Sequence, residues 1–175
     1  MDARFARWRA ALASVVPVRL TCARWYRLIA SKYREEIASD RGAFFGGGRY
    51  NVPEQFGALY LGESLEAVRT EVARRRAPKA PMVLGVFEVT LNRVCDLTNP
   101  EIRNRLGLQA DNLVKDDWSL TQEVAIVVRE AGFEGILAPS AAGPYVNLIV
   151  FSDRLLPDSR VDHLAEQDKE IPPIA

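Results

Sequence analysis

The chain has 175 residues, of which 48% are hydrophobic and 26% charged, as in an ordinary globular protein of one domain. Its 23 basic and 23 acidic side chains cancel, which disfavours direct nucleic-acid binding, and no apolar run approaches the ~18 residues of a membrane span. Cys22, Cys95 and the single His163 stand at no metal-ligand spacing, so we expect no disulfide framework and no metal site. Because the N-terminus lacks a basic segment followed by an apolar one, we expect a cytoplasmic protein.

The first half of the chain changes from a helical to an extended pattern. Residues 2–15 carry apolar side chains at helical spacing, and Pro17 ends this helix. The aromatic and apolar residues that follow predict a strand over 20–29. We expect a glycine-rich loop over 40–53 and a short buried strand over 58–61.

The second half contains two capping signals. Ser64 is predicted to cap a helix that runs to about Arg76. Ser119 is predicted to cap another helix in a capping box with Gln122, and Gly132 ends that helix. The other predicted elements are a strand over 82–91, a short helix over 101–106, and strands over 135–138 and 146–151.

These elements predict an α+β protein. The strands slightly outnumber the helices and do not alternate with them, so we expect a mixed sheet, bent or split, with flanking helices. The core should span about 20–152 of a single domain that covers residues 1–175. Residues 158–175 are acidic and carry Pro172 and Pro173, so we expect them to form a mobile tail.

A glycine-rich segment over 46–51 could bring the backbone close to a ligand. Its three glycines permit φ > 0, Arg49 offers a bidentate fork suited to phosphate, and Tyr50 offers a ring for stacking. It lacks the Gly-Lys-Ser/Thr of a Walker loop and the spacing of the Rossmann fingerprint. A flexible hairpin loop is the alternative interpretation.

Three further polar groups have two possible roles each. Arg27 stands in an apolar strand, where it either points to solvent or faces an anion in a cleft. Glu71 lies at the edge of the apolar stripe of its helix, where it is either solvated or part of a site. Glu63 and Glu66 are alternative candidates for a site carboxylate, and the sequence does not exclude them. Ser140 stands at a strand end, as a turn residue or a hydrogen-bond donor, because no triad histidine or Gly-x-Ser-x-Gly elbow accompanies it.

In this order the segments resemble the RES-domain family of bacterial toxins, which is named after an arginine, a glutamate and a serine. The resemblance runs from about residue 25 to residue 151, and the order and spacing of the segments are more specific than any one of them. The matching segments are Tyr26-Arg27, Gly-Gly-Arg-Tyr-Asn at 47–51, Leu59-Tyr60-Leu61, the helix with Glu71, 132–136, Pro139-Ser140-Ala141 and 147–151.

The resemblance implies an ADP-ribosyltransferase-like fold and NAD⁺ as a substrate, with no prosthetic group. It implies the toxin of a type II toxin–antitoxin system, paired with an Xre-type antitoxin that covers the active site. The implied reaction cleaves the nicotinamide–ribose bond by hydrolysis or phosphorolysis and depletes cellular NAD⁺; the alternative is ADP-ribosylation of a specific protein. Arg27, Glu71 and Ser140 are the implied catalytic residues. The implied NAD⁺-binding residues are Arg27, Arg49, Tyr50, Tyr60, Ser140 and Asn147.

The residue types suit this chemistry. A carboxylate stabilises the oxocarbenium-like transition state, arginines bind pyrophosphate, and an aromatic ring packs on nicotinamide. Nicotinamide leaves as a neutral molecule, so no strong general acid is needed. A non-catalytic nucleotide-binding or DNA-binding subunit is the alternative from another class, and the zero net charge and absence of a clear helix-turn-helix argue against DNA binding.

Overall fold

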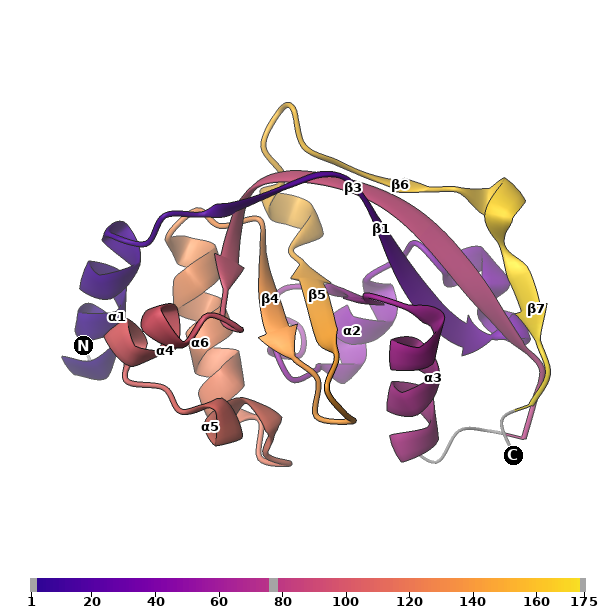
Figure 1. Ribbon diagram of the computed structural model, residues 1–175, viewed down its shortest axis with the longest axis horizontal. Coiled ribbons are helices and arrows are strands. Elements are labelled where there is room, and N and C mark those ends of the chain that lie inside the picture. Colours follow the sequence, from indigo (N-terminus) through magenta and orange to yellow (C-terminus); the bar gives the residue numbers. More distant parts are fainter. Residues whose placement is uncertain (1–2, 76–78, 174–175) are drawn as a thin grey trace.

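The computed structural model describes residues 3–75 and 79–173 and consists of one curved, mixed sheet with helices on two sides of it (Figure 1). No helix in these two ranges is long and apolar enough to cross a membrane. The helices are α1 (Ala3–Ala13), α2 (Arg41–Gly46), α3 (Leu65–Arg74), α4 (Pro100–Leu106), α5 (Ala110–Val114) and α6 (Ser119–Glu130), with 3₁₀ helices η1 (Ser31–Glu36), η2 (Ser152–Arg154) and η3 (Ala165–Gln167). The strands are β1 (Val18–Ala30), β2 (Leu59–Gly62), β3 (Met82–Asp96), β4 (Gly135–Pro139), β5 (Val146–Val150), β6 (Arg160–His163) and β7 (Lys169–Ile171).

The sheet has the strand order β1-β2-β5-β4-β3-β6, with β7 also paired to β3. Only β3 and β4 run parallel among these pairs. The long strands β1 and β3 cross the upper part of the molecule together, from the pair Val18↔Val94 to the pair Ala30↔Met82 (Figure 1). Because β1 also meets β2 at Tyr26↔Gly62, the sheet curls back on itself. The mixed and bent sheet that the sequence predicts is confirmed.

Two groups of helices cover different parts of this sheet. Helices α1, α4, α5 and α6 gather beside β4, and the indole nitrogen of the buried Trp8 in α1 donates to the carbonyl of Leu106 in α4 over 2.7 Å (Figure 1). Helix α3 lies against β1 and β2, where Val68 packs in a separate cluster with Leu28 and Met82. Helix α3 therefore stands apart from the four-helix group, over the part of the sheet formed by β1 and β2.

The predicted helix after Ser64 is confirmed, because the Ser64 side chain accepts a hydrogen bond from the amide of Ala67 over 3.1 Å. The last helical residue is Arg74; the predicted end at Arg76 lies outside the described residues. The structure also contains α2 inside the segment predicted as a loop, and α5, which the sequence did not indicate. Both are shorter than two helical turns, so they are too short to show an apolar period.

The predicted capping box at Ser119 is wrong. Ser119 is the first residue of α6, and its amide and hydroxyl both donate to the Asp117 carboxylate, over 2.9 and 2.6 Å. Gln122 does not turn back to the helix start; its amide group donates to the carbonyls of Gly48 and Asn51. A long-range contact therefore replaces the local one.

The mobile tail expected over 158–175 is also wrong for residues 158–173, and residues 174–175 lie outside the described part of the chain. Strand β6 pairs with β3 from Phe87↔His163 to Thr90↔Arg160, and β7 pairs with β3 from Met82↔Ile171 to Leu84↔Lys169. The segment is ordered because β3 offers unpaired backbone groups along its edge, which an extended segment satisfies whatever its charge.

Candidate active site

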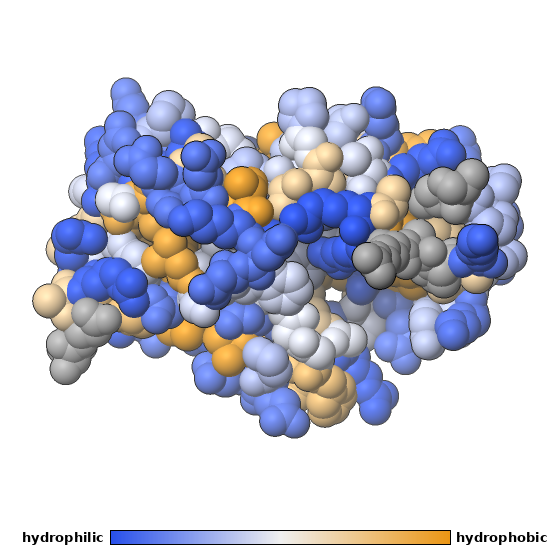
Figure 2. All heavy atoms as spheres, turned by 90° about the horizontal axis from the view of Figure 1, so that it is seen from below, coloured by the Kyte–Doolittle hydropathy of each residue, from blue (hydrophilic) through white to orange (hydrophobic). Residues whose placement is uncertain are grey.

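A cavity of about 340 Å³ lies between α2 and α3, and it brings together segments that are far apart in the sequence. Figure 2 shows the face seen from below, which is hydrophilic over large areas and hollowed near its middle. The cavity is lined by Arg27, Leu28, Ile29, Gly42, Ala43, Gly47, Gly48, Tyr60, Leu61, Gly62, Val68, Glu71, Val72, Arg75, Trp118 and Asn147. The cavity therefore contains both cationic groups and a carboxylate. Such a lining suits a ligand that is anionic in one part and positively charged in another.

Glu71 is held at this cavity by two hydrogen bonds to one of its carboxylate oxygens. The hydroxyl of Ser140 and the side-chain amide of Asn147 both donate to Oε1, the latter over 3.0 Å. Ser140 is itself fixed, because its hydroxyl oxygen accepts from the amide of Ala142 over 3.0 Å. No described residue donates to Oε2, so that oxygen can meet a ligand.

The structure distinguishes the three candidate glutamates. Glu63 and Glu66 are exposed and do not line the cavity. The carboxylate of Glu63 instead accepts a hydrogen bond from the backbone amide of Val146 over 2.8 Å. Glu71 alone of the three lies in the cavity, because it follows Val68 by three residues and so shares the face of α3 that packs on the sheet.

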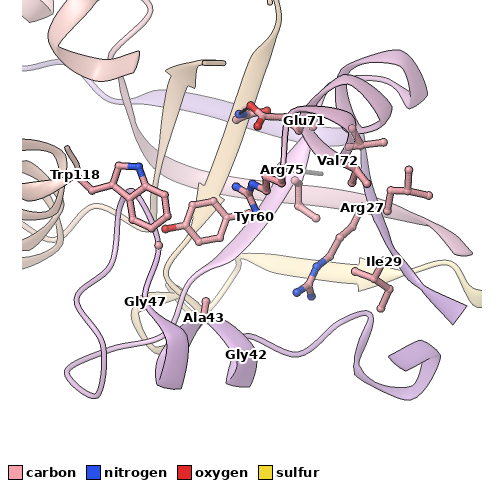
Figure 3. A pocket seen from close by; sticks show the side chains of 16 residues that line it. Arg27, Ile29, Gly42, Ala43, Gly47, Tyr60, Glu71, Val72, Arg75 and Trp118 are labelled. Atoms are coloured by element: carbon pink, nitrogen blue, oxygen red, sulfur yellow. Dashed lines mark hydrogen bonds between the residues drawn. The ribbon is translucent and has the colours of Figure 1, made fainter. Parts of the chain in front are cut away.

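Arg27 projects from β1 into the same cavity (Figure 3). Its Nη1 donates to the carbonyls of Ile37 and Ser39 over 2.7 and 2.8 Å, and to that of Glu36 over 3.4 Å. Burial lowers the pKa of Arg27, and the carboxylates of Asp40 and Glu36 oppose that shift. The guanidinium keeps its charge, and the other nitrogens of its fork are available to a ligand.

The glycine-rich segment is anchored by side chains on both sides of it. The Tyr60 hydroxyl accepts from the amide of Tyr50 and donates to Oδ1 of Asn51, both over 2.9 Å. A Cβ on Gly48 would lie 2.8 Å from that same Oδ1, so only glycine fits there. Together with the two bonds from Gln122, this packing makes the segment part of the cavity wall and excludes the flexible hairpin interpretation.

The sequence matches the RES domain family over residues 24–169, most of the chain. The chain belongs to the RES domain family. The matched range continues past residue 152, where we expected the core to end, and includes β6.

Several proteins similar to this RES domain come from mycobacteria. The NAD(+) phosphorylase MbcT of Mycobacterium tuberculosis is 33% identical over 131 residues, which is 70% of each chain. A probable NAD(+) phosphorylase of the same species is 30% identical over 131 residues, 71% of this chain and 63% of that protein. A chain in the crystal structure of the M. tuberculosis MbcT–MbcA toxin–antitoxin complex superposes with a TM-score of 0.80 at 28% identity, covering 98% of this chain and 94% of that one.

Three residues expected in the site of this RES domain do not line its cavity, and one of them, Ser140, contacts the site only through its hydrogen bond to Glu71. The ring of Tyr50 is 2% exposed and packs in the hydrophobic core, and burial raises the pKa of its hydroxyl. Arg49 points to the carbonyls of Leu113 and Lys115, with its guanidinium 5.8 Å from the centroid of the Trp118 ring. Their neighbours in sequence line the cavity instead, because the segment turns sharply between Gly48 and Asn51.

An aromatic and a cationic side chain that the sequence did not indicate as site residues, Trp118 and Arg75, also line the cavity of the RES domain. Trp118 is 38% exposed and, with Tyr60, supplies the aromatic side of the cavity (Figure 3). Arg75 extends from the end of α3 toward the Tyr60 ring (Figure 3). Arg75 stands four residues after Glu71, the helical spacing that puts two side chains on one face, so it could have been found from the pattern. Trp118 has no such local signal.

Proposed function

We propose that this RES domain cleaves the nicotinamide–ribose bond of NAD⁺, transfers the ADP-ribosyl group to phosphate or water, and acts as the toxin of a type II toxin–antitoxin pair. The observation that carries the proposal is the Glu71 carboxylate, held by Ser140 and Asn147 inside a cavity that also contains arginine and aromatic side chains. The similarity to NAD(+) phosphorylase MbcT, at 33% identity over 70% of each chain, supports the same reaction.

In this proposal Glu71 stabilises the positive charge that develops on the ribose as nicotinamide leaves. The two hydrogen bonds from Ser140 and Asn147 fix the carboxylate before the reaction, so little reorganisation is needed at the transition state. The electron pair of the broken C–N bond goes to the nicotinamide nitrogen, which becomes neutral. Ser140 therefore acts as a positioning residue, and the site works without a histidine.

Arg27 binds the pyrophosphate of NAD⁺ in this proposal. Its Nη1 is occupied by three backbone carbonyls, so the guanidinium is oriented before the ligand arrives. The backbone of Gly47 and Gly48 lines the same cavity and can approach the phosphates closely, since neither residue has a side chain.

The nicotinamide ring packs against Trp118 or Tyr60 in this proposal, in place of Tyr50. Both rings line the cavity, and an aromatic face suits a flat, positively charged pyridinium. The volume of about 340 Å³ is near the lower end of ordinary ligand sites, ~300–1,000 Å³. The nicotinamide–ribose end of NAD⁺ therefore occupies the cavity and the adenosine end extends beyond it.

The proposal includes an ADP-ribosyltransferase-like fold and an Xre-type antitoxin. The bent mixed sheet with a cavity beside β1, β2 and α3 supports the first. The similarity to a chain of the MbcT–MbcA toxin–antitoxin complex supports a protein partner. A cavity with two arginines that receives a pyrophosphate also suits a carboxylate of such a partner, which makes inhibition competitive with NAD⁺.

Incubation of the pure chain with NAD⁺, with and without phosphate, tests the proposal. Release of free nicotinamide without a protein acceptor is the expected result. Labelling of added protein with ADP-ribose would instead favour a protein-modifying transferase. Intact NAD⁺ after incubation with folded chain would refute the enzymatic proposal and favour a non-catalytic nucleotide-binding subunit.

A further inference from the structure

Arg75 is the cation of the cavity that has no role in the proposed binding of NAD⁺. Arg27 and Arg75 are the cationic side chains among the described residues that line the cavity. Arg27 is committed to three backbone carbonyls, whereas the Arg75 side chain has no hydrogen bond or ion pair with any described residue. Its neighbour Arg74 is different, because its guanidinium is paired with Asp116 over 2.7 Å.

The absence of a Glu71–Arg75 ion pair follows from the geometry of the site. A glutamate four residues before a basic residue normally pairs with it along a helix. Here Ser140 and Asn147 hold the Glu71 carboxylate, and Arg75 extends beside Tyr60 instead (Figure 3). The charges of Arg75 and Arg49 partly oppose the burial that raises the pKa of the Tyr60 hydroxyl, which agrees with this placement. Arg75 is thus exposed at the cavity and free to bind an anion.

The proposed reaction needs such a cation when its acceptor is phosphate. A phosphate dianion that approaches the ribose also approaches the Glu71 carboxylate, and the two negative charges repel each other. A guanidinium on the same face of α3 offsets this repulsion and offers a bidentate fork to the phosphate oxygens. Water carries no charge and gains nothing from Arg75.

We propose that Arg75 binds the acceptor phosphate and thereby favours phosphorolysis over hydrolysis, an inference that rests on the proposed NAD⁺ cleavage. A phosphate oxygen forms a bond to the anomeric carbon of the ribose as the bond to nicotinamide breaks. The products are neutral nicotinamide and ADP-ribose that carries the phosphate at that carbon. Hydrogen phosphate reacts without any proton transfer, oxidant or reductant.

The test compares the wild-type chain with R75Q, R75K and the matched control R74Q. Nicotinamide, ADP-ribose and phosphorylated ADP-ribose are separated by chromatography while phosphate and NAD⁺ are varied in turn. We expect R75Q to raise the KM for phosphate about tenfold to a hundredfold, as the loss of a charge-assisted hydrogen bond would. The KM for NAD⁺ changes less, and the product ratio shifts toward ADP-ribose. R75K restores part of the phosphate dependence, and R74Q behaves as wild type.

Four outcomes would overturn the assignment of Arg75, and the last of them would also refute the proposed function. An equal rise of both KM values in R75Q places Arg75 on the pyrophosphate of NAD⁺. An unchanged product ratio in folded R75Q and R75K makes Arg75 a solvated side chain. Wild-type nicotinamide release that ignores phosphate refutes the phosphate site and leaves the proposed NAD⁺ cleavage intact. Failure of the wild type to release nicotinamide under any condition refutes the proposed function itself, and the role of Arg75 with it.

Discussion

At the scale of single residues, the site depends on a carboxylate that other side chains hold in place. Glu71 is fixed from two directions by Ser140, which follows β4, and Asn147 in β5. These two residues are neighbours because β4 and β5 are antiparallel, with Ala138 opposite Asn147. The orientation of Glu71 is therefore a property of the β4–β5 hairpin as much as of α3.

The variant E71Q should keep the fold and lose turnover. Glutamine preserves the size of the side chain and removes the charge that meets the oxocarbenium-like centre. We expect nicotinamide release to fall by ~10²–10³-fold, the usual effect of losing one preorganised electrostatic contact. The matched control is E66Q on the same helix, because Glu66 is exposed and does not line the cavity. Near-normal release by folded E71Q would assign the role to another carboxylate.

The variant R27K should bind NAD⁺ more weakly although the charge is kept. Lysine can replace the bonds to the carbonyls of Ile37 and Ser39, but it has no second arm for the pyrophosphate. Titration calorimetry in the E71Q background measures binding without turnover, and we expect an affinity loss of about tenfold or more. R24K serves as control, since Arg24 pairs with Glu88 away from the cavity. Equal affinity in R27K would remove Arg27 from the binding site.

At the scale of elements, the glycine-rich segment is positioned by residues that come from other parts of the chain. Tyr60 in β2 and Gln122 in α6 hold its backbone, and α2 leads into it. Gly47, directly after α2, has φ 71°, a conformation that other residues rarely adopt. The segment is therefore rigid through its contacts, not through its own sequence.

G48A should impair the reaction without unfolding the protein. The added methyl group would collide with the Tyr60 hydroxyl and lie 2.8 Å from Oδ1 of Asn51, so the segment must shift. We expect a weaker affinity for NAD⁺ and a lower rate of nicotinamide release. G46A is the control, because no atom lies within 4 Å of a Cβ at that position. If both variants show wild-type kinetics, the segment does not shape the site.

The C-terminal strands support the part of the fold that orients Arg27. Glu170 in β7 forms an ion pair with Arg34 in η1 and accepts a hydrogen bond from the hydroxyl of Ser31 over 3.0 Å. Helix η1 leads directly to Ile37, and the carbonyls of Ile37 and Ser39 bind Arg27. The tail thus contacts the segment that presents these carbonyls, because β7 pairs with the start of β3, at the opposite end of that strand from β4 (Figure 1).

Deletion of residues 158–175 should therefore reduce both stability and NAD⁺ affinity. The deletion exposes the edge of β3 and removes the partners of η1. We expect the thermal midpoint to fall by about 5 °C or more, which corresponds to a loss of ~1–2 kcal/mol or more in a protein of this size. A shorter deletion of residues 172–175, after β7, is the control. An unchanged midpoint for the longer deletion would mean that β6 and β7 contribute little.

At the scale of the whole molecule, the proposed activity requires external restraint. An enzyme that consumes free NAD⁺ harms its own cell unless a partner blocks the cavity. Strands β6 and β7 do not block it, because they are paired with β3, and none of the described residues 158–173 lines the cavity. The restraint should come from a second protein that places an anionic group between the arginines.

Expression of the chain alone should stop growth and lower cellular NAD⁺, and co-expression of the antitoxin should reverse both effects. E71Q provides the control, since it retains the surface and loses the proposed turnover. Growth arrest with unchanged NAD⁺ would favour modification of a protein target. Harmless expression of soluble, folded wild-type chain would argue against a toxin.

Much of this protein follows from local sequence. The strands over 20–29, 82–91 and 146–151 were predictable because their residues favour extended structure wherever they pack. Ser64 predicted the start of α3 because a capping side chain and the backbone amide that it binds lie only three residues apart. The family was recognisable because short motifs occur in a fixed order, which the match over 24–169 confirms.

The tertiary structure alone decided which polar side chains meet. Glu71 shares the packed face of α3 with Val68, but only the tertiary structure brings it to Ser140 and Asn147, about seventy residues later in the chain. The exclusion of Tyr50 and the inclusion of Trp118 follow from how the core packs around the glycine-rich segment. The docking of the tail depends on the free edge of β3. Burial and pairing are long-range properties, whereas helix period, strand propensity and capping act over a few residues, and only the latter can be read from the sequence by itself.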